Sequence, residues 1–545
     1  MKKTFSILIT ILIPILLLFA LFSLPEQQAT AGNGSRSVAS QPILAEPVTV
    51  ITVTSGTDPD VSQSKTCTDD PPCTLRRAIV EARLLGDAER PVLIAFNIPE
   101  DEAEGWDSAL DIWKIEINSS LIETTIFRRL NGDIIIDGST QPGGRSAGPK
   151  ILIVGPGTGQ KDGLVVGDVA GDNNHVIRGL GFQNLKTHIF LNTDNNLIED
   201  CWFGLSDDGT GLYLRGGNED DGSGNTGISV ADGANDNLMQ NNVFTGIAGV
   251  AANIVGDHNT FSSNYIGTQA DGNVPDLEPG LVCSPVDWQG GSGLSIGSTD
   301  NIIEDNIIAG IRIAVEPPTI QADSIRVGGD YHIIRNNLIG VDADGDEVGV
   351  CGRGIYLISG TTFNQVLNNT IVSPEYSAIS LNDSPTISTS DANTLRTNII
   401  KKYTPWGQLD DMPSPEDAIQ MTKSLPEEFR NFKPAAVTTI DGVNVSGTSG
   451  EDSPCGGCTI EIFLDDTDEI TETLQSLAVV DADDDGNWSA VIPVALAEGQ
   501  GLRTTSTTNN YGVIPDMYAG TTTGLSILYT PEPEGYLSYL SFVVK

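Results

Sequence analysis

An asparagine-rich segment of eight residues recurs in the middle of the chain and restricts its fold more than any other feature. The copies read HVIRGLGF, NLIEDCWF, NLMQNNVF, NTFSSNYI, NIIEDNII, HIIRNNLI, NQVLNNTI and NTLRTNII, and they begin at residues 175, 196, 237, 259, 301, 332, 364 and 393. The third and eighth positions are apolar in every copy. A repeated unit of about 21 residues that tolerates insertions indicates a solenoid.

The sixth position of the repeat is the most regular polar column. It holds Asn242, Asn264, Asn306, Asn337, Asn369 and Asn398 in the last six copies. Asn suits a bend between strands because it tolerates a left-handed backbone, and stacked Asn side chains can bond along the axis. We therefore expect a structural ladder here and no row of binding sites.

A second strand-like segment precedes most copies: GLVV, HIFL, GISV, GLSI, SIRV, GIYL and AISL. Short strands alternate with turns and no helical period separates them, which favours a parallel β-helix over βαβ units. The predicted fold class is all-β, with one cooperative β-helix over residues 131–402.

Residues 48–130 are expected to form an N-terminal cap and the first coils. Leu75, Ile79 and Ala82 make an apolar stripe at helical spacing, and Thr74 can cap that helix. Such a helix can close the end of the β-helix, whose first coil otherwise has unpaired edges. The arginines of this segment (Arg76, Arg77 and Arg83) are interpreted as solvating and salt-bridging residues on an exposed helix face.

The C-terminal third breaks the repeat. Residues 403–435, rich in proline and containing the helix-like PEDAIQMTKSL, are expected to form a linker and C-terminal cover. Residues 436–530 alternate apolar and polar positions in VNVSGT, TIEIFL, SLAVVDA, NWSAVIPV and SILY, which predicts a small β-sandwich. Residues 531–545 form a tail, either an edge strand or a sorting signal.

The N-terminus carries an export signal. Lys2 and Lys3 precede an apolar run at 5–24, and Ala29-Thr30-Ala31 has the form of a cleavage site. This order predicts a signal peptide over residues 1–31, and the length of the run leaves an uncleaved membrane anchor as the alternative. In both cases the rest of the chain is expected outside the cytoplasm, secreted or at the cell surface.

The charge of the chain limits its partners. There are 29 Lys and Arg residues against 73 Asp and Glu, a formal net charge of −44. Such a surface repels nucleic acid and anionic membranes, so neither is expected as a partner. It leaves loose binding of divalent cations, or simply a well-solvated secreted surface.

Seven cysteines are few for 545 residues, so disulfides can only decorate the fold. The candidate pairs are Cys67–Cys73, Cys455–Cys458 and Cys283–Cys351, which leaves Cys201 over. The CGGC sequence could be a redox motif elsewhere, but before a strand in an exported chain it favours a structural disulfide.

The sequence CTLRRAIVEA at 73–82, with VTVITVTSGTD before it and IIIDGSTQPG at 134–143 after it, resembles the CSLREA-type bacterial extracellular proteins. That resemblance implies a right-handed parallel β-helix of the pectin-lyase-like superfamily. Arg77 stands where the family commonly has Glu, on a helical position taken as exposed. The sequences VSGTSGEDSPCGGCTIEIFLDD and DADDDGNWSAVIPV resemble bacterial Ig-like modules.

The superfamily includes pectate lyases and polygalacturonases, so the resemblance makes a polysaccharide lyase or glycoside hydrolase one alternative. The fragments NTD at 192–194 and EDD at 219–221 are similar to hydrolase motifs, but the chain has no G-H-G or R-I-K sequence, and no catalytic residue is assigned. We expect a non-catalytic glycan-binding or adhesion-type protein, with polysaccharides or cell-surface components as partners. A purely structural spacer is the third alternative.

Two aspartate triads could hold Ca²⁺, the one cofactor considered. They are Asp342, Asp344 and Asp346, and Asp481, Asp483 and Asp485. Neither completes an EF-hand: Gly345 is the fourth residue of its run instead of the sixth, and Ile492 occupies the twelfth position where Glu is needed. The alternatives are an exit turn of a coil for the first triad and a hairpin turn for the second.

Overall fold

A computed structural model of the chain describes residues 46–59, 64–100, 105–118, 125–156, 161–167, 173–211, 226–247, 249–274, 293–311, 323–350, 352–373, 377–381, 392–402, 418–421, 432–450, 455–468, 470–508 and 520–531. The predicted signal peptide, the Cys283–Cys351 pair, the EDD fragment and nearly all of the tail lie outside these ranges. None of the helices within them is long and apolar enough to cross a membrane.

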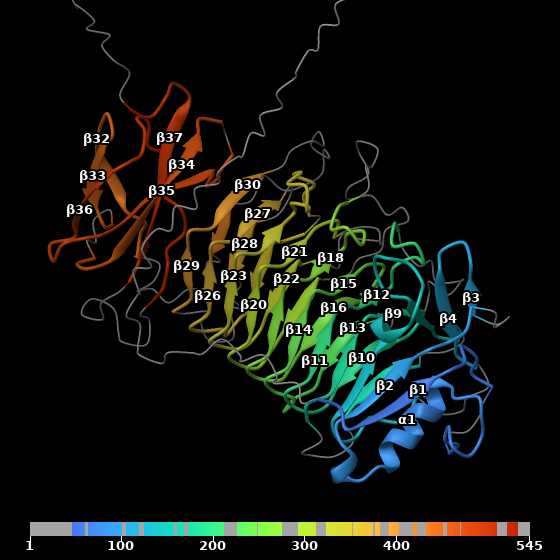
Figure 1. Ribbon diagram of the computed structural model, residues 1–545. Helices are drawn as coiled ribbons and strands as arrows, with labels where there is room; N and C mark the ends of the chain where they lie inside the picture. Colours follow the sequence, from blue (N-terminus) through green and yellow to red (C-terminus); the bar gives the residue numbers. More distant parts are fainter. Residues whose placement is uncertain are drawn as a thin grey trace, which may run out of the picture. The chain divides into compact units, whose positions relative to one another are not determined.

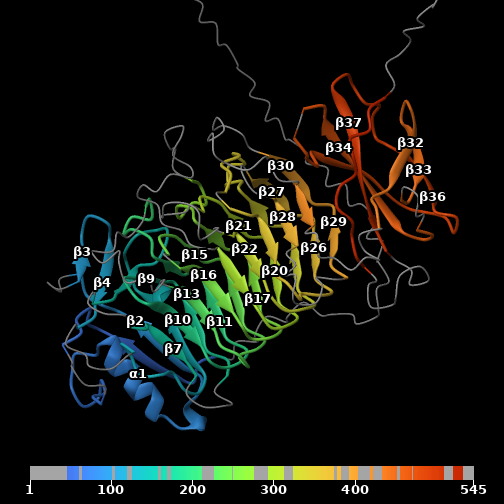
Figure 2. The ribbon, with the colours of Figure 1, turned by 180° about the vertical axis from the view of Figure 1, so that it is seen from behind.

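Three long sheets, parallel except for one antiparallel pair (β3 with β4), build a β-helix, as predicted (Figures 1 and 2). In the described residues, sheet 1 contains, in order, β1 (Thr49–Val53), β2 (Val92–Phe96), β5 (Ile134–Asp137), β8 (Val176–Arg178), β11 (Leu197–Glu199), β14 (Leu238–Gln240), β17 (Thr260–Ser262), β20 (Ile302–Glu304), β23 (Ile333–Arg335), β26 (Gln365–Leu367) and β29 (Thr394–Arg396).

Sheet 2 contains β3 (Trp106–Asp107), β4 (Ile112–Glu116), β6 (Ile151–Val154), β9 (Leu180–Gln183), β12 (Trp202–Phe203), β15 (Val243–Phe244), β18 (Tyr265–Ile266), β21 (Ile307–Ile308), β24 (Leu338–Ile339), β27 (Thr370–Ser373) and β30 (Ile399–Lys402). Sheet 3 contains β7 (Leu164–Val166), β10 (Thr187–Leu191), β13 (Thr226–Val230), β16 (Val250–Ile254), β19 (Leu294–Ile296), β22 (Ile325–Val327), β25 (Ile355–Leu357), β28 (Ile379–Leu381) and β31 (Ile419–Met421).

The apolar columns of the repeat face inward, because every coil stacks on the next in register. Ile198 pairs with Ile177 and Met239, and all three side chains are completely buried. Aromatic residues of the eighth column stack in the same core, with the Phe182 and Phe203 ring centroids 5.3 Å apart. Burial of this continuous apolar interior is the main force that holds the coils together.

The sixth-column asparagines form the predicted ladder. The Asn306 amide Nδ2 donates to Asn337 Oδ1 at 2.9 Å and to the Phe261 carbonyl at 3.0 Å. The other amides repeat this pair of donations, except that of Asn398 at the end, which donates to the Val366 carbonyl. The expectation that these asparagines adopt the left-handed conformation is wrong. The residue before each of these asparagines has the left-handed conformation instead, for example Asp305 (φ 57°) and Asn336 (φ 57°). The chain bends at that residue, and the Asn that follows turns inward.

A second buried ladder occupies the first column of the repeat, and the sequence interpretation missed it. Its members, all 0–1% exposed, are His175, Asn196, Asn237, Asn259, Asn301, His332, Asn364 and Asn393. The Asn237 side chain donates to Asn259 Oδ1 at 2.9 Å, and the backbone N–H of Asn301 donates to Nδ1 of His332 at 3.0 Å. Two ladders therefore fix the two ends of the sheet 1 strands from β14 to β29.

The capping helix α1 (Leu75–Leu84) lies over the first coil, beside β1 and β2 (Figure 1). The Thr74 hydroxyl accepts from the Arg77 N–H at 3.4 Å, as the capping prediction requires. Short 3₁₀ segments follow at Asp87–Glu89 and Gly138–Thr140. The predicted Cys67–Cys73 disulfide is formed beside the helix.

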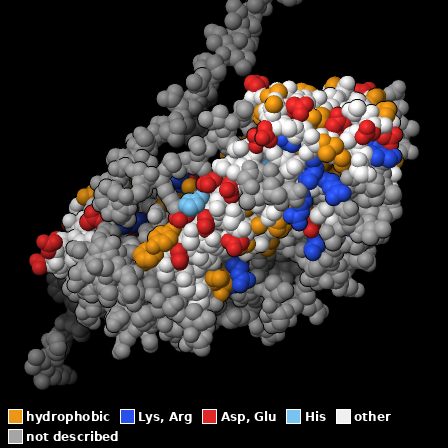
Figure 3. All heavy atoms as spheres, turned by 90° about the horizontal axis from the view of Figure 1, so that it is seen from below, with side chains coloured by type: hydrophobic (Ala, Val, Ile, Leu, Met, Phe, Trp, Pro, Cys, Tyr) orange, Lys and Arg blue, Asp and Glu red, His pale blue; other side chains and the backbone are white. Residues whose placement is uncertain are grey.

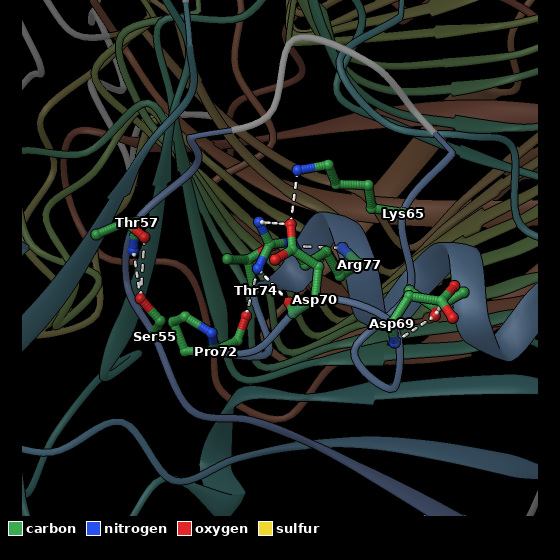
Figure 4. Close-up of polar contacts among 9 residues, drawn as sticks. Ser55, Thr57, Lys65, Asp69, Asp70, Pro72, Thr74 and Arg77 are labelled. Carbon is green, nitrogen blue, oxygen red and sulfur yellow. Dashed lines mark hydrogen bonds and ion pairs between the residues drawn. The ribbon is translucent and has the colours of Figure 1, made fainter.

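The exposed-face interpretation of the cap arginines is wrong for two of the three. Arg76 and Arg77 are 2% and 4% exposed. Arg76 makes a bidentate pair with buried Asp58, at 2.7 and 2.6 Å. Arg77 donates to the Pro72 carbonyl at 2.8 Å and pairs with Asp70 at 3.0 Å (Figure 4). Both guanidinium groups hold the loops around the helix through hydrogen bonds and ion pairs. These contacts replace the contacts with water that the two side chains lose on burial.

A β-sandwich follows the rod. One antiparallel sheet has the order β32 (Ala436–Asp441), β33 (Asn444–Thr448) and β36 (Asn487–Val491), and the other has β35 (Gln475–Asp481), β34 (Thr459–Asp466) and β37 (Gln500–Thr507). Side chains of both sheets, including Trp488 and Ile462, share one core. Strands β32 and β37 were not predicted, and SILY contributes only an isolated bridge between Tyr529 and Leu502. The Cys455–Cys458 disulfide is formed as expected.

The helix-like PEDAIQMTKSL contains a strand instead. Residues Ile419–Met421 form β31, which pairs with β28 at the end of sheet 3. Pairing with the rod therefore overrides local helix propensity, and part of the predicted linker belongs to the β-helix.

The sandwich covers backbone groups of the last coil. Ile400 and Thr473 exchange backbone hydrogen bonds at 3.0 and 3.2 Å. The Thr521 and Thr522 hydroxyls accept from the backbone N–H groups of Ala392 and Leu395, both at 2.9 Å. Such contacts remove the open strand edges that would otherwise invite aggregation.

Candidate functional site

The long connections of the rod lie on one side of each coil. Only two residues separate most sheet 1 strands from the next sheet 2 strand, as between β14 and β15. Five of the connections from sheet 2 back to sheet 3 are far longer: 204–225, 267–293, 309–324, 340–354 and 403–418. Three others, 184–186, 245–249 and 374–378, are short. Insertions on one face of a solenoid often border its binding surface, and the three sheets have outer faces of different character.

The outer face of sheet 1 satisfies its own charges. Arg178 pairs with Asp137 at 2.7 Å and with Glu199 at 3.7 Å, and the Gln240 amide donates to Glu199 at 2.9 Å. Farther along, Arg335 pairs with Glu304 at 2.6 Å. These residues occupy equivalent positions on successive strands, so this face is a ladder of ion pairs.

The outer face of sheet 2 is apolar and covered. Its outward column includes Trp202, Tyr265 and Leu338, all half-buried. The turns that follow the strands fold back onto it: Gly209 and Gly272 approach the rings of Trp202 and Tyr265 so closely that a Cβ on either glycine would meet the ring. Around β12 and β18 this face is therefore covered by the chain's own turns.

Those turns include the first aspartate triad. The Ala343 N–H donates to the Gly272 carbonyl at 3.1 Å, so the Asp-Gly turns stack coil on coil. Asp342 is buried, and its Oδ1 accepts from the Asp346 N–H at 2.9 Å. Asp344 exchanges hydrogen bonds with Asn273 of the neighbouring turn, at 3.2 and 3.3 Å. These contacts favour the exit turn, and a Ca²⁺ ion on this triad stays an untested prediction.

The second triad also lies in a turn, although the turn does not close a hairpin. Asp483 Oδ1 accepts from the N–H groups of Asp485 at 3.0 Å and Asn487 at 2.7 Å, and Asp481 accepts from Thr459. The flanking strands β35 and β36 belong to different sheets, so the turn connects the two layers of the sandwich. Ca²⁺ binding at this triad is likewise untested.

Among the described residues, a different group of carboxylates converges. Oxygen atoms of Asp465, Asp466 and Glu472, in the sandwich, lie within 4.8 Å of one another. Asp465 is completely buried and forms an ion pair with Arg503. Burial raises the pKa of Asp465, and the guanidinium opposes that rise. The Arg503 guanidinium already neutralises Asp465, so we interpret the cluster as a buried network of charged side chains.

The outer face of sheet 3 differs from the other two. Register pairs place one outward residue from each strand in a single column: Val165, Phe190, Ser229, Asn253, Ser295, Arg326, Tyr356, Ser380 and Gln420. Within the described part of the chain, the side chains of Ser229, Asn253 and Ser295 make no hydrogen bond. Neighbouring members are about 4.8 Å apart, the spacing of adjacent strands. From Ser229 to Ser295 the column thus offers three evenly spaced, unengaged hydrogen-bonding groups, whereas Ser380 farther along donates to Gln420 at 3.1 Å.

A basic and aromatic cluster lies in the middle of that column. The guanidinium carbon of Arg353 lies 3.3 Å from the Tyr356 ring centroid, and that of exposed Arg326 lies 6.0 Å from it. Arg353 also donates to both oxygens of buried Asp323, at 2.7 and 3.2 Å. Burial raises the pKa of Asp323 above its ordinary value, against the opposing effect of Arg353. Arg326 makes no ion pair with any described residue.

The sequence contained a signal for this column that the sequence interpretation did not use. The third residue of HIFL, GISV, GLSI, SIRV and GIYL is the outward one in each strand. Asn253 could not be found in this way, because its strand (VAANI) does not resemble the others. No predicted metal ligand belongs to the column.

No model of a known family matches the chain, and no curated protein sequence matches it. Solved structures do. An alginate lyase from Paenibacillus sp. str. FPU-7 is 14% identical over 65% of this chain and 96% of that one, with a TM-score of 0.37. A tailspike protein mutant of E. coli bacteriophage HK620, in complex with a pentasaccharide, is 10% identical over 76% of this chain and 80% of that one, with a TM-score of 0.28.

The Dettilon tailspike protein is 11% identical over 87% of this chain and 93% of that one, with a TM-score of 0.29. All three TM-scores lie below 0.5.

Proposed function

We propose that the protein binds a linear polysaccharide along the outer face of sheet 3. The observation that carries the proposal is the column of unengaged polar side chains from Ser229 to Ser295, which continues to Arg326 and Tyr356. Hydroxyl, amide and guanidinium groups are the donors and acceptors that recognise sugar hydroxyls. A spacing of about 4.8 Å suits a polymer of sugar units that passes from coil to coil.

The net charge of the chain and the exposure of Arg326 also support a polysaccharide ligand. The net charge of −44 disfavours nucleic acid and anionic membranes, whereas an uncharged or locally anionic glycan can still reach Arg326. Arg326 is exposed and would attract a carboxylate or sulfate group of the polymer. Ser, Asn and Gln side chains do not ionise near neutral pH and so are poor general acids or bases, which suits the column to binding without bond cleavage.

The alternative is a polysaccharide lyase or hydrolase, and one observation favours it. Asp323 combines burial, a raised pKa and a position beside the column, which are features of a general acid. Its bidentate contact with Arg353 argues for a structural role instead, because the ion pair favours the charged carboxylate.

We also propose that the N-terminal segment is a CSLREA-type cap, that the sandwich is a bacterial Ig-like module, and that the chain is exported to the cell surface or medium. The Thr74-capped helix and the two disulfides support these assignments, since disulfides persist in oxidising compartments. N-terminal sequencing of the secreted protein should find a start at residue 32. Retention in the membrane with residues 1–31 intact would show an anchor.

The experiment that tests binding is a panel of neutral and acidic oligosaccharides, each measured for binding and for product release, with and without Ca²⁺. The proposal predicts binding without turnover. Release of unsaturated or reducing ends that disappears in Asp323→Asn would establish the enzymatic alternative. If no oligosaccharide is bound and no product is released, both the binding proposal and the enzymatic alternative are wrong, and the structural spacer is favoured.

A further inference from the structure

The corner that leads from sheet 3 into sheet 1 carries its own outward column, separate from the sheet 3 face. Its residues all adopt the left-handed conformation, with φ between 56° and 67°: Asn174, Asn195, Asp236, His258, Asp300, Tyr331, Phe363 and Ala392. Backbone hydrogen bonds stack these corners, as from His258 N–H to the Thr299 carbonyl at 3.2 Å. The column therefore consists of eight residues that occupy the same backbone position in eight coils.

Two bulky residues in this column do not suit their backbone, and the small Ala392, which shares the conformation, is buried. Asn, Asp and His are several-fold enriched at positive φ, whereas a bulky aromatic residue there is an outlier. Tyr331 (φ 61°) and Phe363 (φ 57°) occupy the site in consecutive coils. An unfavourable conformation that recurs in neighbouring coils points to a function that the aromatic rings perform.

The two rings form a parallel stack at the surface. Their centroids are 5.0 Å apart with an interplanar angle of 5°, and Tyr331 is 49% exposed. It is the one Phe, Tyr or Trp side chain among the described residues with so large an exposed fraction. The stack compensates part of the backbone cost. Burial cannot account for the choice of aromatic residues here, because Tyr331 stays half in solvent.

The surroundings restrict what can bind. Asp330 precedes Tyr331, and Asp300 occupies the corner one coil before it. Figure 3 shows a face of the molecule on which acidic side chains lie beside hydrophobic and histidine side chains. Nucleic acid bases also stack on aromatic rings, but these carboxylates and the net charge of −44 repel a phosphate backbone. A lipid surface would require a wider apolar patch than two rings.

We infer that Tyr331 and Phe363 form a second carbohydrate site, distinct from the sheet 3 face, which takes a neutral sugar. The C–H groups of a sugar ring pack against the aromatic stack, and its hydroxyls donate to nearby carboxylates such as Asp300. A neutral glycan is expected because these carboxylates repel uronic acids and sulfated sugars. The site needs no residue of the sheet 3 column, so each site can fail independently of the other.

The test replaces the rings with the residue type that the corner prefers. Tyr331→Asn/Phe363→Asn in the full chain should raise the melting temperature, by roughly 1–3 °C, because Asn adopts positive φ more readily. Titration calorimetry with cellohexaose, xylohexaose and mannohexaose should show that at least one binds the wild type, and that the double variant binds it at least about tenfold more weakly. Asp236→Asn, at the same corner site, is the matched control and should change neither quantity.

Three results would overturn the inference: a lower melting temperature for the double variant, which would make the stack a stabilising feature; unchanged affinity; or no binding of any neutral hexaose by the wild type. Oligogalacturonate measured on the same proteins separates this site from the sheet 3 face. Its binding should be insensitive to the corner variant and sensitive to Arg326→Ala.

Discussion

The backbone N–H of Thr397 donates to both carboxylate oxygens of Glu461, at 3.0 and 3.2 Å. Thr397 is the left-handed corner residue of the last coil, and Glu461 lies on strand β34 of the sandwich. Glu461 is 1% exposed. The Glu461 carboxyl group thus accepts a backbone hydrogen bond that the next coil would accept if the rod were longer.

This contact predicts a pH-dependent stability. Burial is the main cause that raises the pKa of Glu461 to about 7 from 4.5, while Arg396 and the Thr397 N–H oppose the rise. The folded state therefore favours the protonated acid, and stability is lost as pH rises from 4.5 to 7. Glu461→Gln, which stays neutral, should raise the free energy of unfolding by about 1–3 kcal/mol at pH 8 and change it little at pH 4.5. Urea unfolding at both pH values measures this, and an equal effect at the two would contradict it.

The asparagine ladder predicts a large cost for a single internal substitution. Asn306→Ala removes the two side-chain donations to Phe261 and Asn337, and it leaves the Asn264 N–H without its acceptor at 2.9 Å. Buried groups left unsatisfied cost about 1–3 kcal/mol each, so a loss of about 3–5 kcal/mol is expected in urea unfolding. Asn336→Ala, at an exposed left-handed corner, is the control and should cost about 1–2 kcal/mol. A similar loss for both variants would mean that the ladder is not the source of stability.

The ladder shows what the sequence could and could not predict. Asn242 and its equivalents recur at fixed positions of an alignable segment, so the repeat, the coil bends and the inward apolar columns follow from local pattern. Arg77 was misplaced because helical spacing does not reveal the loop at Asp70–Pro72 that covers it. The sheet 3 column was missed because its neighbouring members are 24 to 42 residues apart in the sequence and become neighbours only when strand register is known.

The stacked Asp-Gly turns predict that the first aspartate triad is insensitive to Ca²⁺. Asp342→Asn keeps an oxygen that can accept from the Asp346 N–H, so the unfolding free energy should change by less than about 1 kcal/mol. Differential scanning calorimetry with 1 mM Ca²⁺ and with EDTA checks this, with Asp483→Asn tested in parallel. A calcium-dependent rise in melting temperature that Asp342→Asn abolishes would establish a metal site there.

The cap predicts that one arginine is essential for stability and a neighbouring one is not. Arg76→Met leaves Asp58 buried without its bidentate partner, which should cost about 3–5 kcal/mol. Arg76→Met/Asp58→Asn should recover part of that loss, because the remaining group is neutral. Arg83→Met, near the end of the same helix, should change stability by less than about 0.5 kcal/mol. If the double variant is no more stable than Arg76→Met, the loss comes from packing and not from the unpaired charge.

The central claim is that the outer face of sheet 3 binds a polysaccharide, and matched variants on two faces of the rod test it most directly. Asn253→Ala/Ser295→Ala/Arg326→Ala removes three consecutive members of the column, and Gln240→Ala/Ser262→Ala removes two outward residues of sheet 1. The ligand for calorimetric titration is the charged oligosaccharide that binds the wild type most tightly. The sheet 3 variant should reduce its affinity at least about 30-fold, or roughly 2 kcal/mol, and the sheet 1 variant should leave it unchanged. Equal affinity of both variants, with both folded, would contradict the account.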